Sequence, residues 1–508
     1  MKIIKILMAF LFFGIFSCSE LNEEIRDTIN EETALAEVEV SALLTAVYEA
    51  HRTPYQDQSR FWAAQQHTTD ETLGPTRGPD WDDNGIWRVL HQHTWDSDHS
   101  FLSNTFNELL EIVFNASVII ETFGDKATAQ QIAEARFIRA FAMFSVLDGW
   151  GQVPFRDDLD DFSKDPQVLS GNEAIDFIIN ETNTAMTNLP ERSAVQAYVA
   201  NKDAARVLLI KAYLNKGTFA DRSNPSFPSE DMDQVITLSQ QLVGSGNYSV
   251  SDNVFDNFAP NNDAISTELI YTNENRGGES SGNVRSRWFC TLHYNQNPSG
   301  WNGFTTIADF YDRFDANDER LGLSYDGVTD ISGIKVGMLE GQQFDEKGTA
   351  LKDRSGAPLA FTKEVSAVEN GSNLEVTGVR VIKYPIDYDG GDNADNDYVF
   401  YRYSDVLLMK AEAHLRKGDE ATALDLVNQI RSKRGFTQDL TALTLEDLLD
   451  ERGFELYWEG HRRTDLIRFG KFLDAYSGKE SSGSERLLFP IPSGALASNP
   501  NFVQNPGY

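Results

Sequence analysis

The chain has few cysteines and few basic residues, and each shortage excludes a class of protein. Its 508 residues include two cysteines, Cys18 and Cys290, so a small core held by a framework of disulfides is excluded. Lysine and arginine number 44 against 78 aspartates and glutamates, which gives a net charge of −34. This acidic balance argues against nucleic acid, an anionic membrane surface and polyanionic glycans as partners.

The N-terminus has the form of an export signal followed by a lipidation site. The apolar run 6–16 is far shorter than the roughly 20 residues of a membrane-spanning helix, so residues 1–17 are predicted to be a signal peptide. Residues 15–18, Ile-Phe-Ser-Cys, match a bacterial lipoprotein cleavage box, which predicts acylation of Cys18. Residues 18–33 would then form a lipidated, acidic tether, and only the lipid would enter the membrane. The alternative is an ordinary signal peptide with an incidental cysteine.

Residues 402–435 predict two helices folded back on each other. Ser404 can cap the first helix, and Gly418 and Gly435 can end the two helices. The apolar residues recur at helical spacing, and the turn is short enough to make the helices antiparallel. A related piece occurs upstream, where residues 212–217 match residues 413–418 at Ala, Leu, Lys and Gly.

The same helical spacing occurs along most of the chain. Helices are expected at about 34–51, 101–123, 127–147, 172–189, 203–216 and 231–243, and at 445–459 with a continuation or kink into 464–472. The helix pairs resemble tetratricopeptide units without a fixed period. The predicted fold is therefore dominated by α-helices, with divergent tetratricopeptide-like pairs in a right-handed superhelical scaffold. Residues 34–508 are expected to form one domain.

Two stretches interrupt the helical pattern and are rich in tryptophan. They cover about 53–100 and 245–400, where glycines, turns and short strand-like runs dominate. The tryptophans in these stretches are Trp62, Trp81, Trp87, Trp95, Trp288 and Trp301. We expect both stretches to form an irregular, loop-rich face over the helical body, and aromatic residues in loops favour ligand contact.

Four motifs in order are similar to those of the SusD/RagB family. They are residues 139–155, with RAFAMF and WGQVPF; residues 402–413, RYSDVLLMKAEA; residues 451–468, ERGFELYWEGHRRTDLIR; and the ending FPIP at 489–492 with QNPGY at 504–508. The resemblance implies a surface lipoprotein of the Bacteroidetes outer membrane that faces the exterior. It also implies a SusC-like TonB-dependent outer-membrane transporter as partner, to which the protein passes oligosaccharides or, in some branches, peptides.

Binding sugar requires aromatic faces and nearby polar groups. Trp81, Trp288 and Trp301 are the predicted stacking residues, because the resemblance places a platform on loops in these two stretches. Arg77, Asp82 and Asn295 lie beside them in the sequence and can bond hydroxyl groups. The alternative for each tryptophan is a ring packed in the core. Trp87, Trp150 and Trp458 occur in scaffold-like contexts and are expected to be structural.

Candidate catalytic and metal-binding groups have structural explanations. Glu455 and Glu459 lie one helical turn apart, but arginines nearby favour ion pairs over a glycosidase pair. His91, His93 and His99 could form a fortuitous metal site. The aspartates between Asp387 and Asp397 could hold calcium, although their spacing departs from an EF-hand and favours a solvated loop. We expect no cofactor and no metal.

The sequence therefore predicts a binding protein and not an enzyme. The acidic balance favours a neutral polymer, and a β-glucan is the predicted ligand. A peptide-binding member of the same family and a surface glycoside hydrolase are the alternatives.

Overall fold

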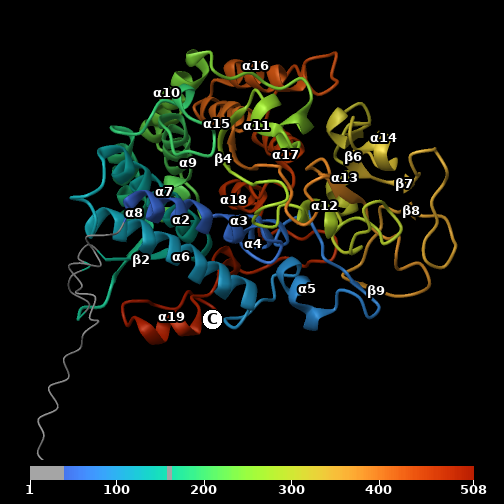
Figure 1. Ribbon diagram of the computed structural model, residues 1–508, viewed down its shortest axis with the longest axis horizontal. Coiled ribbons are helices and arrows are strands. Elements are labelled where there is room, and N and C mark those ends of the chain that lie inside the picture. Colours follow the sequence, from blue (N-terminus) through green and yellow to red (C-terminus); the bar gives the residue numbers. More distant parts are fainter. Residues whose placement is uncertain (1–38, 157–158, 160–162) are drawn as a thin grey trace, which may run out of the picture.

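Helices form most of the described chain, as their apolar spacing predicts. The structure is a computed structural model that describes residues 39–156, 159 and 163–508. The predicted signal peptide, Cys18 and the acidic tether lie outside these residues. In Figure 1 a helical body adjoins a lobe of loops and short strands, coloured yellow to orange, which is formed by the later part of the irregular region expected at 245–400.

The helices differ widely in length. The longer ones are α2 (Val40–Ala50), α6 (Ser100–Glu121), α7 (Ala129–Trp150), α8 (Gly171–Met186), α9 (Lys202–Ala220), α10 (Ser229–Ser245), α15 (Tyr403–Arg416), α16 (Glu420–Arg431) and α17 (Leu445–Leu456). The shorter ones are α3 (Arg52–Gln56), α4 (Phe61–Gln66), α5 (Ile86–His91), α11 (Asn262–Ile265), α12 (Ser286–Phe289), α13 (Ala308–Tyr311), α14 (Thr329–Ser332), α18 (Arg462–Arg468) and α19 (Ser493–Ser498).

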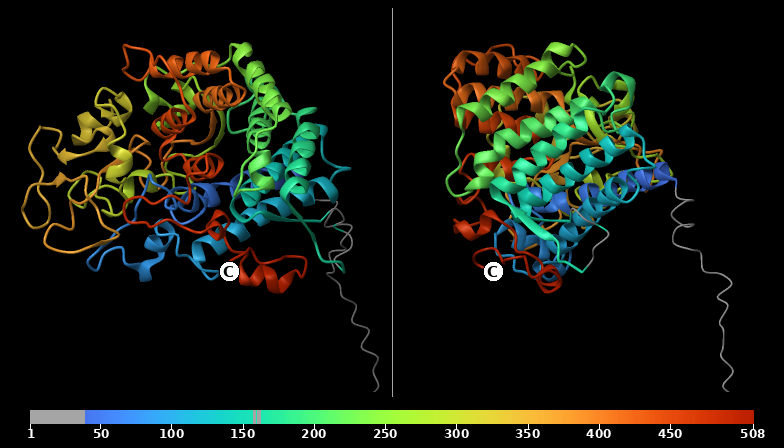
Figure 2. Two further views of the ribbon diagram at one scale, coloured as in Figure 1. Left: turned by 180° about the vertical axis from the view of Figure 1, so that it is seen from behind. Right: turned by 90° about the vertical axis from the view of Figure 1, so that its left-hand side faces the viewer.

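Most of the long helices pack against the next long helix in the chain. This holds from α6 to α10 and again for α15 with α16, and α10 packs on α15 to join the two groups. Figure 2 shows the cyan to green helices stacked side by side. The helix-dominated fold is thus confirmed. Within the described part of the chain, no helix combines the length and the apolar character that crossing a membrane would require.

Local sequence explains where several helices begin and end. Thr128 and Gln131 form a capping box at the start of α7, and the Asp419 side chain caps α16. Helix α9 extends to Ala220, past the expected end at residue 216. A Cβ atom at Gly217 would lie 2.0 Å from the carbonyl oxygen of Ser226. Glycine is therefore needed there for a close approach of two chain segments, and not as a stop.

The expected cap at Ser404 is wrong. Helix α15 begins at Tyr403 without a side-chain cap, and the buried Ser404 hydroxyl donates to Glu268 at 2.6 Å. Helix α17 ends at Leu456, and the chain turns at Trp458 with a φ of 63° before α18 begins. For the helix predicted at 445–459, the structure shows the kink into the following helix and not the continuation.

The strands are short. They are β1 (Thr76–Arg77), β2 (Gln152–Phe155), β3 (Gln167–Ser170), β4 (Leu269–Asn273), β5 (Gly322–Leu323), β6 (Val336–Leu339), β7 (Gly341–Gln342), β8 (Ala360–Phe361), β9 (Val368–Glu369), β10 (Arg380–Ile382) and β11 (Tyr398–Arg402). Strand β6 lies between β10 and β5 in an antiparallel sheet, and β1 pairs in parallel with β9. The pairs β2 with β3 and β7 with β8 are antiparallel.

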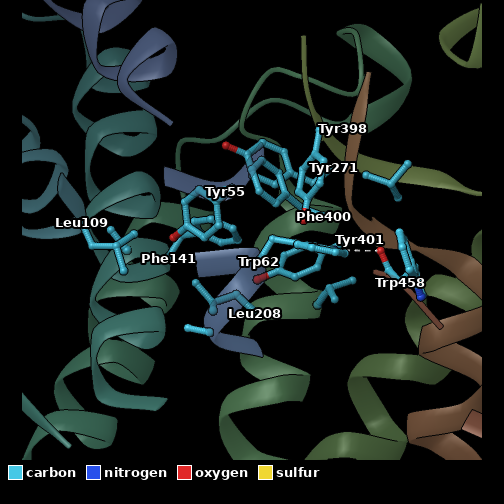
Figure 3. Close-up of a cluster of buried hydrophobic side chains, with 14 of the residues drawn as sticks. Tyr55, Trp62, Leu109, Phe141, Leu208, Tyr271, Tyr398, Phe400, Tyr401 and Trp458 are labelled. Carbon is cyan, nitrogen blue, oxygen red and sulfur yellow. Dashed lines mark hydrogen bonds between the residues drawn. The ribbon is translucent and has the colours of Figure 1, made fainter. Parts of the chain in front are cut away.

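The antiparallel pair of β4 and β11 is buried along its whole length and lies against the helices. Its rings meet those of α3 and α7: Tyr55 lies 5.3 Å from Phe141 and 5.1 Å from Phe400, measured between ring centroids. Figure 3 shows this cluster, with the Trp62 indole donating to the backbone oxygen of Trp458 at 3.1 Å. The core therefore joins residues from distant parts of the chain.

A buried ion cluster joins β11 to α17. Arg402 donates to Glu455 and Glu459, both at 2.8 Å, and pairs with Glu268 at 3.1 Å. Burial alone would raise the pKa of Glu455, but Arg434 and Arg402 hold it well below its usual range. Glu455 and Glu459 are thus held in ion pairs, which agrees with their predicted structural role and leaves this pair unsuited to glycosidase chemistry.

Candidate functional site

Only two of the eight tryptophans reach the surface of the described structure. Trp301 is 46% exposed and Trp81 is half-buried. The buried ones are Trp62, Trp87, Trp95, Trp150, Trp288 and Trp458. The expected structural roles of Trp87, Trp150 and Trp458 agree with this burial. Of the six tryptophans in the two tryptophan-rich stretches, only Trp81 and Trp301 are accessible to a ligand in the described structure.

Trp81, Phe289 and Trp301 form one aromatic surface, which we call the platform. The Trp81 indole nitrogen donates to the backbone oxygen of Trp301 at 2.8 Å. The two indole rings lie 6.2 Å apart with an angle of 59° between them. The Phe289 ring lies 4.9 Å from that of Trp301 and is inclined to it by 66°. Residues more than 200 positions apart in the chain are thus brought together.

The backbone around Trp301 holds the platform in place. Helix α12 ends at Phe289, and the chain returns so that the Trp301 amide donates to the Phe289 oxygen at 2.8 Å. The Gly303 amide likewise donates to the oxygen of Cys290 at 2.7 Å. Trp81 follows a tight turn at residues 77–80 and has a φ of 61°, which is uncommon for a bulky residue. Such local strain is often found at functional sites.

Gly303 is needed for the position of Trp81. A Cβ atom on Gly303 would lie 2.2 Å from the Trp81 ring. We predict that Gly303→Ala displaces this ring, breaks its bond to Trp301 and changes the near-ultraviolet circular dichroism. Gly494→Ala is the matched control, because its added methyl group would meet nothing within 4 Å. Identical spectra for the two variants and the wild type would contradict this account of the platform.

Polar side chains gather beside the platform in what we call the Arg354 cluster, made of Asp80, Tyr294, Arg354 and Glu375. The Arg354 guanidinium lies 3.9 Å from the centre of the Tyr294 ring and 3.4 Å from Asp80. It also pairs with Glu375. The Tyr294 hydroxyl donates to Asp80 at 2.9 Å. Asp80 is the neighbour of Trp81, so the cluster and the platform are continuous.

The surroundings of Tyr294 and Glu375 fix their protonation states at neutral pH. Burial, together with the bond to Asp80, raises the pKa of Tyr294 to about 12, so its hydroxyl stays protonated. Burial alone would raise the pKa of Glu375, but hydrogen bonds from Arg354 and His293 lower it below its usual value. The cluster therefore offers donors and acceptors in fixed positions, which suits hydroxyl groups.

The structure corrects one of the three predicted stacking residues. Trp288 is 2% exposed and lies in α12 with its ring in the core. Its neighbour Phe289 is half-buried and contacts Trp301 instead. Trp288 cannot offer a face to a ligand in this conformation, so the prediction of its stacking role is wrong. Trp81 and Trp301 do lie on one surface.

The three predicted polar residues support loops around the site. Arg77 is 3% exposed, and its guanidinium donates to the backbone oxygens of Leu374 and Thr377, both at 2.7 Å. Its predicted direct contact with a ligand is therefore wrong. Asp82 is half exposed and pairs with Arg88 at 3.2 Å. Asn295 is exposed, and its amide donates to the oxygen of Lys352 at 2.8 Å.

Sequence reasoning missed Phe289, Tyr294, Arg354 and Glu375. Phe289 and Tyr294 lie between the predicted residues, and a search for aromatic residues other than tryptophan would have found them. Arg354 and Glu375 carry no such signal. A turn of the chain at residues 353–357 holds Arg354, and Glu375 comes from a later loop and pairs with it.

The candidate metal ligands have other partners. Asp387 accepts from the amides of residues 389, 390 and 395, and Asp392 pairs with Arg285. Asp397 accepts from Thr272 and from the amide of Asn275. The rings of His91, His93 and His99 bond backbone oxygens. No group of three histidine, cysteine or carboxylate residues in the described ranges is arranged to hold a metal ion.

Comparison with known proteins finds one matching family model and a similar protein. The model of the SusD family matches residues 267–485. The starch-binding protein SusD of Bacteroides thetaiotaomicron is 27% identical over 433 residues, which cover 76% of this chain and 74% of that protein.

Two solved structures have the same fold. One is a SusD superfamily protein from Parabacteroides distasonis, with 18% identity, a TM-score of 0.70 and coverage of 95% of this chain and 100% of that one. The other is surface glycan-binding protein A from Bacteroides thetaiotaomicron in complex with laminarihexaose. It has 18% identity, a TM-score of 0.67 and coverage of 92% and 98%.

Proposed function

We propose that the chain is a member of the SusD family, which its matches to the family model and to SusD support, and that it is a cell-surface lipoprotein that binds glycan on the platform and the Arg354 cluster. The observation that carries the proposal is the exposed Trp301 ring, held beside Trp81 and next to fixed polar groups. Aromatic faces stack on the apolar faces of sugar rings, and the polar groups bond their hydroxyls. The chain captures its ligand and breaks no bond.

The ligand we propose is a neutral oligosaccharide or polysaccharide, with a β-glucan as the first candidate. Three partly exposed arginines beside the platform already have carboxylate partners: Arg88 with Asp82, Arg285 with Asp392, and Arg354 with Asp80 and Glu375. A uronate or a sulfate group would therefore meet paired cations among several carboxylates, which disfavours its binding. The laminarihexaose bound to a protein of the same fold is a β-glucan oligosaccharide, which supports this candidate.

A charge substitution tests the preference for neutral glycans. Asp80→Asn keeps an acceptor for Tyr294 but removes one negative charge from Arg354. We predict that this variant gains several-fold affinity for polygalacturonate at low salt, and that the gain disappears at high salt because exposed charges are then screened. Asp233→Asn on α10 is the control, since Asp233 pairs with Lys417 away from the platform. An equal gain in affinity for polygalacturonate in both variants would contradict the proposal that charges beside the platform disfavour acidic glycans.

The proposed role includes delivery to a SusC-like TonB-dependent transporter at the outer membrane, with the chain anchored through Cys18. Both parts rest on family membership and on the N-terminal sequence. Co-purification from membranes of the source organism tests them. If the anchored chain is purified from these membranes and no transporter is purified with it, the delivery role is contradicted.

The ligand class is tested by affinity electrophoresis of the chain from residue 19 onward, which retains every described residue. Gels are cast with neutral and acidic polysaccharides. Retardation by a neutral β-glucan alone is the expected result. If no polysaccharide retards the chain and mixed peptides bind to it, then the peptide-binding alternative replaces this proposal. Release of reducing sugar would instead favour a glycoside hydrolase.

A further inference from the structure

The aspartate-rich stretch at residues 387–397, which we call the Tyr388 segment, lies next to the platform. Asp392 in this segment is exposed and pairs with Arg285. The Arg285 guanidinium lies 4.5 Å from the centre of the Phe289 ring, which belongs to the platform. The segment therefore reaches the platform through one ion pair.

Tyr388 joins the same segment to the loop that carries Trp301. The Tyr388 ring is half-buried, and its hydroxyl donates to the backbone oxygen of Asn297 at 2.9 Å. Asn297 precedes Trp301 by four residues, so their two Cα atoms are at most about 14 Å apart. The Tyr388 ring is thus a further aromatic group close to the platform.

The Tyr388 segment is fixed by its own hydrogen bonds. The Asp387 carboxylate is 9% exposed and accepts from three backbone amides of the segment, at 3.0, 2.9 and 2.7 Å. A neighbouring loop adds two bonds, from the Gly277 amide to the Asp395 side chain and from the Gly278 amide to the oxygen of Asn393, both at 2.8 Å. A surface that is already ordered loses less entropy when it binds a ligand.

The pair of Arg285 and Asp392 supplies polar groups at this edge of the platform. The bond to Asp392 engages one nitrogen of Arg285. A guanidinium carries five N–H donors, so others remain for hydroxyl groups. The Asp392 side chain is 85% exposed and offers acceptor oxygens. The pair has no net charge, which suits the hydroxyl groups of a neutral glycan.

We propose that the glycan-binding surface continues from the platform across the pair of Arg285 and Asp392 to Tyr388. The ligand is then an oligosaccharide long enough to contact both Trp301 and Tyr388, with one sugar ring packed on each. This proposal rests on the proposed function and adds to it a preference for chain length. A mono- or disaccharide that covers Trp301 makes only part of these contacts, so longer chains bind more tightly.

The proposal is tested by titrating laminaribiose and laminarihexaose into the chain from residue 19 onward, followed by NMR for the first and by calorimetry for the second. Tyr388→Ala is expected to weaken binding of laminarihexaose about threefold to tenfold, as for one lost aromatic contact, and to leave that of laminaribiose unchanged. Trp301→Ala is expected to weaken binding of both sugars. Tyr213→Ala is the matched control, because Tyr213 is a half-buried tyrosine on α9, outside this surface.

Tyr388→Phe separates contact with the ring from placement of the loop. It keeps the ring and removes only the bond to Asn297, so binding of laminarihexaose is expected to stay close to that of the wild type. If Tyr388→Ala does not fold, Asp392→Ala at its exposed position takes its place, with an expected loss of about threefold for laminarihexaose alone.

The outcomes distinguish this proposal from the proposed function. Equal losses for the two sugars in Tyr388→Ala, or no loss for either, would overturn the extension to Tyr388 and leave the platform as the binding site. A wild type that binds neither sugar would overturn the β-glucan as ligand, and the extension with it.

Discussion

Trp301→Ala is expected to lower the affinity for a neutral β-glucan by about 10-fold to 30-fold, or about 1.4–2 kcal/mol. Trp301 is the most exposed ring of the platform, so a sugar ring stacked on it loses most of its apolar contact when the indole is removed. The Trp81 indole bonds the backbone oxygen of residue 301 and keeps this partner in the variant. The expected loss therefore measures stacking on Trp301 itself.

Phe344→Ala is the matched control for this experiment. Phe344 is 45% exposed, about as much as Trp301, but it lies outside the platform. Affinity electrophoresis and calorimetry of both variants should show a loss for Trp301→Ala alone, with unfolding midpoints close to that of the wild type. Equal affinities of Trp301→Ala and the wild type for the β-glucan would show that the platform is not the glycan-binding site.

Arg402→Met is expected to lower the free energy of unfolding by about 3–5 kcal/mol, because it leaves several carboxylates without their main cation. Arg402 is 1% exposed and pairs with Glu268, Glu455 and Glu459. The cluster joins β11 to α17, so the central strands and the last long helix should loosen together. Chemical unfolding followed by circular dichroism measures the change.

Lys363→Met provides the comparison for Arg402→Met. Lys363 pairs with Asp312 on the surface, where both side chains are more than a third exposed. Pairs of this kind contribute little to stability because water and salt screen them, so no measurable change is expected. Equal unfolding curves for Arg402→Met and the wild type would show that the buried cluster is not needed to hold β11 and α17.

The helical body could be predicted because its signals are local. Apolar residues at helical spacing predict α6 to α10 and the pair α15 and α16. Gly418 and Gly435, both with positive φ, follow two and four residues after the ends of α15 and α16. Gly217 has the same place in its motif but lies inside α9, since what it serves is contact with a distant segment. A local pattern cannot distinguish these two uses of glycine.

The site could be predicted only in part. Trp81 and Trp301 could be predicted from their loop-like surroundings and from the family resemblance, but Trp288 and Phe289 are adjacent and only one of them faces solvent. Helix α12 is a single turn, too short for its periodicity to indicate which one. Arg354 reaches the site through the folding of a loop. The Arg77 side chain is buried because it donates to backbone oxygens of another loop. These outcomes depend on tertiary contacts.

The most direct test of the account is a crystal structure of the chain with laminarihexaose bound. The account predicts that at least one glucose ring lies against the Trp301 indole, with hydroxyl groups bonded to residues of the Arg354 cluster and with Trp288 still buried. A bound oligosaccharide that leaves Trp301 exposed to solvent would contradict it.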